Sequence, residues 1–216
     1  MSGFFLVLEG PEGAGKTTLA AALADRLRGR GLDPVMVREP GGTPPAEHAR
    51  KALLDPESRL EPHVELLFVA AARAHLVQSI VRPALEGGRI VVSDRYELST
   101  EAYQGAGRGI PAETVAAVNQ VATGGLRPDL TLVLDVPPDI GETRQRAAGK
   151  SRDRFEREDA AFHERVYRSY RGAAGPGIRH IDGRAEPGAV LEAAWEALLE
   201  ARPETFGGRP DYISKI

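Results

Sequence analysis

The stretch Gly10–Thr17, which reads Gly-Pro-Glu-Gly-Ala-Gly-Lys-Thr, decides the fold of this 216-residue chain. It matches the pattern G-x-x-x-x-G-K-[ST] and lies between an apolar run at residues 4–8 and an Ala/Leu-rich stretch at 18–27. Between a strand and a helix, this pattern forms a phosphate cradle, because its glycines let backbone N–H groups turn toward the α- and β-phosphates. We expect Lys16 to reach the β- and γ-phosphates and the Thr17 hydroxyl to bind Mg²⁺.

The composition is that of a soluble globular protein. Hydrophobic residues make up 42% of the chain and charged residues 27%, and the length fits one domain. The net charge of −3, with no polybasic block, argues against binding to nucleic acid or to a membrane surface. The chain has no cysteine, which excludes disulfides and suits a cytoplasmic location. We expect neither a signal peptide nor a membrane span, because the apolar runs are too short for a span of ~20 residues.

Short apolar runs alternate with helical patterns along the chain. Strands are expected at residues 4–8, 34–37, 89–93, 130–135 and 178–181. Helices are expected at residues 17–28, 62–85, 111–122, 138–147, 156–171 and 187–201. Continuous apolar strands alternating with helices indicate right-handed crossovers and a mostly parallel sheet.

The expected fold is therefore a single α/β domain over residues 1–216, with a five-stranded, mostly parallel sheet in three α/β/α layers. In such folds, ligands bind beyond the carboxyl ends of the strands. The polar, Gly- and Pro-containing tail at residues 207–216 is expected to fray or to pack on a neighbouring molecule.

A second motif, Asp94-Arg95-Tyr96, directly follows the expected strand at 89–93. An acid at the end of a buried strand in a P-loop protein is the Walker-B position, which binds Mg²⁺ directly or through water. Arg95 would then stand between the donor's phosphates and the acceptor, where a guanidinium can bind phosphate oxygens in a bidentate manner. The alternative is a structural Asp–Arg pair on a turn.

Three further places carry polar side chains with two possible interpretations. The loop at residues 38–43, Arg-Glu-Pro-Gly-Gly-Thr, is either a simple turn or a substrate loop whose Arg38 meets an anion. Tyr103 and Gln104 are of the types that hold a base and a sugar, but they also suit a solvated helix end. Arg73 lies in an apolar surround, which is unusual for a charge unless it contacts a ligand or a partner.

The segment at residues 144–157 is rich in basic residues: Arg144, Arg146, Lys150, Arg152, Arg154 and Arg157. A run of charges is often only a solvated surface. In a P-loop enzyme, it also fits a short lid that closes over the triphosphate, neutralises charge and excludes water. Since the phosphate loop has no arginine, we expect this lid and Arg95 to supply the positive charge.

Taken in order, these motifs resemble those of the bacterial thymidylate kinases, a family of P-loop nucleoside monophosphate kinases, over nearly the whole chain. Besides the phosphate loop, the matching pieces lie at 38–43, 72–73, 82–85, 93–96, 99, 102–105, 107–109, 128–129, 153–156 and 162–166. The resemblance implies a P-loop kinase fold and Mg²⁺-dependent transfer of the ATP γ-phosphoryl group to dTMP, giving dTDP and ADP in dTTP biosynthesis. It also implies a homodimer.

The resemblance implies roles on the acceptor side. Glu12 would approach the thymidylate sugar and phosphate, Arg73 would hydrogen-bond the thymine edge, and Arg95 would grip the acceptor phosphate. Tyr103 would lie under the deoxyribose and help to reject a 2′-hydroxyl. The implied dTMP-binding residues are Glu12, Arg38, Phe68, Arg73, Arg95, Ser99, Tyr103 and Gln104.

On the donor side, the resemblance implies a lid that supplies catalytic charge. The implied ATP-binding residues are Gly10, Pro11, Glu12, Gly13, Ala14, Gly15, Lys16, Thr17, Thr18 and Arg144. The implied catalytic residues are Lys16, Arg95, Arg152 and Arg154. The implied Mg²⁺ ligands are Thr17 and Asp94.

Two places depart from the family's pattern. The thymine-stacking phenylalanine of the family usually lies four residues before the base-binding arginine, where this chain has Val69, and Phe68 lies one position earlier. Either a local bulge swings Phe68 toward the base, or Val69 packs against it instead. The lid is also short between Arg146 and Asp153, so the arginine that reaches the γ-phosphate stays open.

Two other kinds of function are compatible with a phosphate loop. Another nucleoside monophosphate kinase or a deoxynucleoside kinase would differ only in its acceptor, and Arg73, Gln104 and Tyr103 favour thymidylate. A GTPase switch needs an Asn-Lys-x-Asp motif, and the nearest candidate, at 119–122, lacks its Lys and Asp. A partitioning ATPase needs a second P-loop lysine, where this chain has Glu12 and a glycine.

Overall fold

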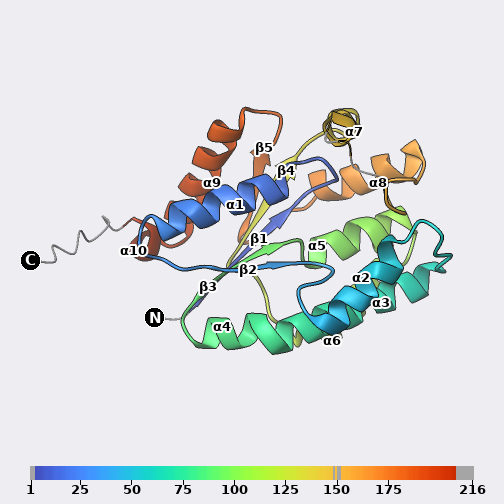
Figure 1. The fold of residues 1–216 in the computed structure, drawn as a ribbon, viewed down its shortest axis with the longest axis horizontal. Coiled ribbons are helices and arrows are strands. Elements are labelled where there is room, and N and C mark those ends of the chain that lie inside the picture. The colour runs from blue at the N-terminus through green and yellow to red at the C-terminus, as the bar shows by residue number, and fades with distance from the viewer. Residues whose placement is uncertain (1–2, 148, 150–151, 208–216) are drawn as a thin grey trace, which may run out of the picture.

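Five parallel strands form one sheet, and every neighbouring pair is in parallel register. The computed structural model describes residues 3–147, 149 and 152–207, and the strand order is β2-β3-β1-β4-β5 (Figure 1). The strands are β1 (Phe4–Glu9), β2 (Val35–Arg38), β3 (Ile90–Asp94), β4 (Leu130–Asp135) and β5 (Ile178–Asp182). The expected α/β fold with five strands is confirmed, and its sheet is parallel throughout.

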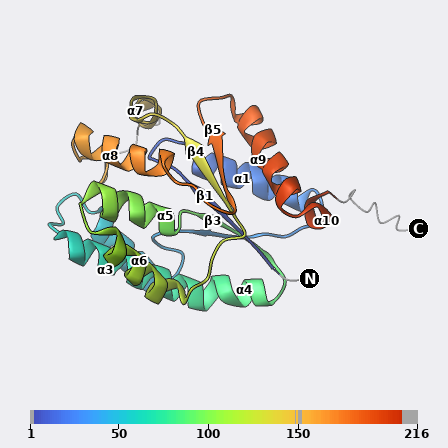
Figure 2. The same cartoon turned by 180° about the vertical axis from the view of Figure 1, so that it is seen from behind.

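Helices cover both faces of the sheet, which gives the three expected layers (Figures 1 and 2). The helices are α1 (Lys16–Arg28), α2 (Pro44–Leu54), α3 (Pro62–Leu76), α4 (Arg82–Glu86), α5 (Glu97–Thr100), α6 (Ala112–Thr123), α7 (Pro138–Ala147), α8 (Ala160–Arg171), α9 (Pro187–Ala201) and α10 (Pro203–Phe206). α1 and α9 pack on one face, while the run from α3 to α4 and α8 pack on the other.

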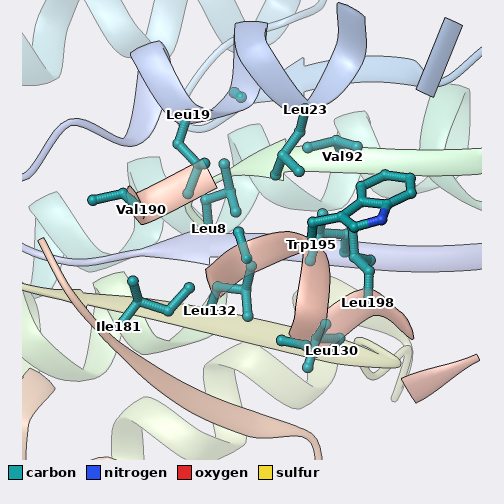
Figure 3. Packing of buried hydrophobic residues seen from close by; sticks show 14 of the residues in the cluster. Leu8, Leu19, Leu23, Val92, Leu130, Leu132, Ile181, Val190, Trp195 and Leu198 are labelled. Atoms are coloured by element: carbon teal, nitrogen blue, oxygen red, sulfur yellow. The ribbon is translucent and has the colours of Figure 1, made fainter. Parts of the chain in front are cut away.

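The burial of β1 on both faces explains why its sequence is apolar without alternation. Every residue of β1 is buried. Because neighbouring side chains of a strand point to opposite faces, Leu8 packs toward α1 and α9, while Val7 packs toward the other helical layer. Figure 3 shows the first of these cores, where strand leucines meet Leu23 of α1 and Trp195 of α9.

The run at residues 62–85 was expected to be one α-helix, but it contains a π-helical turn, Val77–Val81. Within this turn, the Arg82 N–H donates to the carbonyl five residues earlier, that of Val77. The cause is Pro83, which has no N–H and cannot continue the regular pattern of hydrogen bonds. In the described residues, this run is also the one helix that is long and apolar enough to cross a membrane, yet it carries the fully buried Glu65 and Arg73 and packs against α2 and α6.

Some elements were not expected from the sequence. α2 begins after Thr43, whose side chain accepts a hydrogen bond from the Ala46 N–H. The short α5, the π-helical segment Glu101–Gly107 and α10 were also missed. α8 begins at residue 160 and not at 156, because the Asp159 side chain accepts from the Phe162 N–H and caps the helix there. The expected tail lies outside the described residues beyond Gly207.

Candidate active site

The candidate active site lies at the carboxyl ends of the strands, around the phosphate loop that joins β1 to α1. On one side is a cavity of about 100 Å³, lined among others by Glu12, Arg73, Arg95, Ser99, Tyr103 and Gln104. On another side is a cavity of about 390 Å³, whose lining includes Ala14, Gly15, Thr18 and Arg144. We call these the acceptor cavity and the donor cavity. Six of the eight residues expected to bind dTMP line the first cavity, and four of the ten expected to bind ATP line the second.

The phosphate loop is held by its glycines and by Lys16. Gly13 has a φ of +71°, and a Cβ there would lie 2.2 Å from the carbonyl oxygen of Gly141 in α7. A side chain is therefore excluded on both conformational and steric grounds. The Lys16 Nζ donates to the carbonyl oxygens of Gly10 at 2.7 Å and Pro11 at 2.8 Å. Burial and the nearby Arg95 charge lower the pKa of Lys16 to about 8.

The Thr17 hydroxyl and the Asp94 carboxylate, which the sequence analysis expected to bind Mg²⁺, meet beside the loop. Thr17 Oγ1 donates to Asp94 Oδ2 at 2.7 Å. In the described part of the chain, no group of three or more His, Asp or Glu side chains could hold a metal ion. Two protein oxygens nevertheless fit Mg²⁺, which keeps water and substrate phosphates as its other ligands.

Arg95 lies between the phosphate loop and the acceptor cavity. Its Nη2 donates to Glu12 Oε1 at 2.8 Å, and its Nη1 donates to the Gly10 carbonyl at 3.2 Å. The guanidinium also lies over the ring of Tyr103, 5.1 Å from its centroid, and the Tyr103 hydroxyl donates to Glu12. Burial lowers the pKa of Arg95, but Glu12, Tyr170, Asp94 and Glu9 together outweigh this and raise it, so the arginine stays charged.

The backbone of Arg95 is strained. It is the one residue other than glycine with a positive φ, +78°, among the residues that the structure describes. Its N–H donates to the Leu8 carbonyl at 2.9 Å, and its carbonyl accepts from the Ser93 hydroxyl at 2.7 Å. A left-handed conformation costs a residue with a side chain on the order of 1–3 kcal/mol, and such strain is concentrated at functional sites.

Glu9 was not singled out from the sequence. It is fully buried and accepts hydrogen bonds from the N–H groups of Tyr96 at 2.7 Å and Ser99 at 3.1 Å. It also accepts from the hydroxyls of Ser99 at 2.6 Å and Tyr170 at 3.2 Å. Burial raises the pKa of Glu9 against the opposing effect of these hydrogen bonds. An acid at the end of a buried strand was the one signal that could have identified it.

Arg73 lines the acceptor cavity but binds protein groups. Its Nε pairs with Glu39 Oε2 at 2.7 Å, and its Nη1 donates to Thr100 Oγ1 at 2.8 Å and to Asn119 Oδ1 at 2.6 Å. Its Nη2 donates to the Tyr96 carbonyl at 2.8 Å. Burial raises the pKa of Glu39 to about 7, although Arg73 opposes this. Glu39 of the same chain thus compensates the buried charge of Arg73. The contact of Arg73 with thymine stays a prediction.

Glu65 joins the acceptor side to the expected lid. This fully buried carboxylate of α3 accepts from Gln104 Nε2 at 2.6 Å and pairs with Arg154 Nη2 at 2.8 Å. Arg154 also donates through its Nε to the Leu53 carbonyl at 2.9 Å. The guanidinium expected to be catalytic is therefore bound on the acceptor side in this structure.

The other arginines of the expected lid face different surroundings. Arg144 donates to the Gly183 carbonyl at 2.9 Å and lines the donor cavity. Arg152 is 54% exposed, lies 3.8 Å from Glu142 and lines a third cavity of about 520 Å³ together with Glu12. Lys150 lies outside the described residues.

Two residues expected to bind dTMP do not line the acceptor cavity. Phe68 is half-buried and packs against Ala46, Ala49 and Ala72, and the cavity is lined by its neighbour Val69. Arg38 is bound to Glu47 at 2.8 Å and lies in an open groove beside Thr17 and Asp94. Val69 therefore lines the cavity, and which of the two side chains packs against the base stays a prediction.

The cavity also contains residues that the sequence did not single out. Arg50 lines it from α2 and donates to the Pro40 carbonyl at 2.8 Å, and Asp153 lines it from the segment before α8. Arg50 could not be found because α2 itself was missed. Arg50 and Asp153 come from distant segments of the chain, so a local sequence pattern could not predict that they line the same cavity.

Comparison with known proteins gives a consistent result. The family model "Thymidylate kinase" matches residues 8–193. The thymidylate kinase of Pseudomonas fluorescens SBW25 is 47% identical over 211 residues, covering 96% of this chain and 100% of that protein. The thymidylate kinase of Thermomicrobium roseum is 47% identical over 200 residues, covering 91% and 95% respectively. That of Pseudomonas putida GB-1 is 52% identical over 171 residues, covering 79% and 81%.

Proposed function

The chain belongs to the thymidylate kinase family, and we propose that dTMP occupies its acceptor cavity and ATP its donor cavity, with the phosphate loop between them. The protein is a kinase that phosphorylates dTMP to dTDP with ATP, in nucleotide biosynthesis. One observation carries the assignment of the site: Arg95 binds both Glu12 and the Gly10 carbonyl of the loop while lining the acceptor cavity.

On the acceptor side, Arg95 binds the dTMP phosphate. Its five donors can form parallel hydrogen bonds to phosphate oxygens, and Glu12 and Tyr103 orient it. Tyr103 lies against the deoxyribose, while Ser99, Gln104 and Arg73 face the rest of the nucleotide. Because a phosphate monoester has a second pKa of about 6, the acceptor is already a dianion near neutral pH and needs no general base.

On the donor side, Lys16 neutralises the β- and γ-phosphates once its Nζ leaves the loop carbonyls. Thr17 and Asp94 would hold Mg²⁺, which supplies charge neutralisation to the triphosphate when bound. Arg144 binds the nucleotide at the donor cavity. Arg152 is an exposed arginine of the expected lid that lines a cavity together with Glu12, so it is available to the γ-phosphate, and Arg154 can join it only by leaving Glu65.

The work of the site is positioning and charge stabilisation. The acceptor oxygen attacks the γ-phosphorus, the bond to the bridging oxygen of ADP breaks, and the charge develops between Lys16, Arg95 and the lid. We further propose that the enzyme is a cytoplasmic homodimer that binds neither nucleic acid nor membrane, consistent with its net charge of −3.

The test is a phosphate-transfer assay with ATP and each nucleoside monophosphate in turn. We expect dTMP to be preferred, thymidine to be inert, and ATP turnover to require the acceptor. A preference for AMP or UMP would refute the assignment of the acceptor cavity. Turnover of ATP at the full rate without any acceptor would instead indicate an ATPase.

A further inference from the structure

We propose that Glu9 is a positioning residue for Arg95. Glu9 ends β1, one residue before the phosphate loop, and it does not line the acceptor cavity. It is fully buried, and within the described residues its contacts are hydrogen bonds, without a direct ion pair. The proposal rests on the proposed function, because it takes Arg95 as the residue that binds the acceptor phosphate.

The first contact of Glu9 is with the backbone that follows Arg95. Its Oε1 accepts from the N–H groups of Tyr96 and Ser99, the first of which belongs to the peptide that leaves the left-handed Arg95. Tyr96 is the N-cap of α5 and makes no capping hydrogen bond with its own side chain. Glu9 thus satisfies the Tyr96 N–H, shares the Ser99 N–H with the Tyr96 carbonyl at 3.2 Å, and holds a turn that a side chain at φ +78° would otherwise disfavour.

The second contact of Glu9 is with the hydroxyls that bind the Arg95 guanidinium. Glu9 Oε2 accepts from the Ser99 hydroxyl at 2.6 Å, and the Tyr170 hydroxyl lies 3.2 Å from Glu9 Oε2 and 2.8 Å from Ser99 Oγ, so that its one hydrogen goes to one of these two oxygens. A hydroxyl has one hydrogen, so each hydroxyl that donates to Glu9 turns its lone pairs elsewhere. Arg95 Nη1 donates to both of them, at 3.2 Å and 3.1 Å respectively. An ionised carboxylate therefore turns the Ser99 hydrogen toward Glu9 and leaves the Ser99 lone pairs to Arg95 and Tyr170.

This arrangement explains why a carboxylate is needed. An amide in its place has one acceptor oxygen and an NH₂ group that can only donate. That NH₂ would compete with the Arg95 guanidinium for the lone pairs of Ser99 and Tyr170. The substitution Glu9→Gln keeps the size of the side chain and disturbs the direction of the hydrogen bonds around Arg95.

The experiment is a double-mutant cycle of Glu9→Gln with Arg95→Ala, measured by steady-state kinetics and by calorimetric binding of dTMP. We expect Glu9→Gln to lower kcat/KM for dTMP on the order of 10²-fold, as for a misplaced binding group, with the KM for ATP unchanged. In the Arg95→Ala background, the same change should cost almost nothing more. The matched control is Glu97→Gln, since Glu97 is a buried acid of α5 that pairs with Arg127 and, among the described residues, has no hydrogen bond or ion pair with Arg95.

The outcomes separate the possibilities. If Glu9→Gln costs the same factor in both backgrounds, Glu9 only supports the fold and the proposal is overturned. If Arg95→Ala itself keeps normal dTMP binding and turnover, the assignment of Arg95 fails, which is a failure of the proposed site and is seen without any Glu9 variant. Should Glu9→Gln not fold, Tyr170→Phe replaces it in the cycle. If Tyr170→Phe lowers kcat/KM less than Glu9→Gln was expected to, and this loss disappears in the Arg95→Ala background, the proposal is supported. If Tyr170→Phe costs the same factor in both backgrounds, the proposal is overturned.

Discussion

At the scale of single residues, the charges of this site are organised in buried pairs and networks. Arg95, Arg73 and Arg154 each face a carboxylate, namely Glu12, Glu39 and Glu65 respectively. Burying an arginine without a partner would be costly, because its guanidinium cannot lose its proton. These partners set the direction of each guanidinium, and so they set which arginine can meet a substrate phosphate.

For Arg95, we expect the substitution Arg95→Ala to remove at least ~3 kcal/mol of transition-state stabilisation, because it deletes a donor to the acceptor phosphate. The measurement is kcat/KM for dTMP, with circular dichroism to confirm the fold. The control is Arg179→Ala, since Arg179 is an exposed arginine of β5 far along the chain from the loop. A value of kcat/KM close to that of the parent enzyme would refute the assigned role.

For Arg154, we expect Arg154→Ala to raise the KM for dTMP more than it lowers kcat. The reason is that its guanidinium pairs with Glu65, which in turn binds Gln104 in the acceptor cavity. Initial rates over a grid of ATP and dTMP concentrations separate the two effects. A loss confined to kcat would show that Arg154 leaves Glu65 during the reaction and acts on the transferred phosphate.

At the scale of elements, the sequence patterns and the structure agree where an element is long and buried. All five strands lie within a residue of their expected positions. β1, β3 and β4 are buried apolar runs, as expected for the centre of a parallel sheet, whereas β2 and β5 at the edges are more exposed. The misses are α2, α5, α10 and the π-helical segment Glu101–Gly107, which carries Tyr103 and Gln104. These elements are short or irregular, and they are stabilised by capping and tertiary contacts more than by their own periodicity.

His180 of β5 contacts β4 and the segment after α8, and these contacts predict a pH-dependent stability. It lies on β5, with Nδ1 3.0 Å from the Asp135 carboxylate of β4 and Nε2 2.7 Å from the Ala173 carbonyl that follows α8. Both nitrogens face acceptors, so the doubly protonated ring fits best. Burial lowers the pKa of His180, but the Ala173 carbonyl and Asp135 outweigh this and raise it.

Because the pKa of His180 is raised in the folded state, its stabilisation is complete below the unfolded value and is lost as the pH rises through the folded value. We therefore expect the parent protein to lose stability relative to His180→Gln as the pH rises above the unfolded pKa of about 6.5. The difference should be below about 1 kcal/mol, since the pair is partly exposed. Urea unfolding at several pH values measures it, and an equal pH dependence in both proteins would refute it.

At the scale of the whole molecule, the large exposed hydrophobic side chains lie on α3 and α6. Among the described residues, these are Val64 and Leu67 of α3 and Val121 of α6, with Val121 84% exposed. The two helices pack against each other. Exposed apolar side chains on neighbouring helices are a suitable surface for the proposed homodimer.

We accordingly expect Leu67→Glu to convert a dimer to a monomer, because a charge would have to be buried at the interface. Light scattering after size exclusion gives the mass of each form. The exposed-site control Ala201→Glu, at the end of α9, should stay dimeric. If the parent protein already has the mass of one chain, the dimer proposal fails, and if Leu67→Glu remains a dimer, the interface lies elsewhere.

The sequence by itself determined the fold class, the phosphate loop and the family, because each depends on residues that are adjacent in the chain or regularly spaced. Gly10–Thr17 is a local motif, because its glycines and lysine form a phosphate-binding loop wherever a strand precedes it and a helix follows. The same holds for Asp94, which meets Thr17 because the carboxyl ends of neighbouring parallel strands share one edge of the sheet.

Only the tertiary structure decided which partner each buried charge takes. Glu9 meets Tyr170 across 161 positions of the chain, and Arg73 meets Glu39 across 34. It also brought Val69, and not Phe68, to the acceptor cavity. The physical reason is that a buried ion pair or hydrogen bond requires a precise approach of two segments in space, which no periodicity along the chain contains.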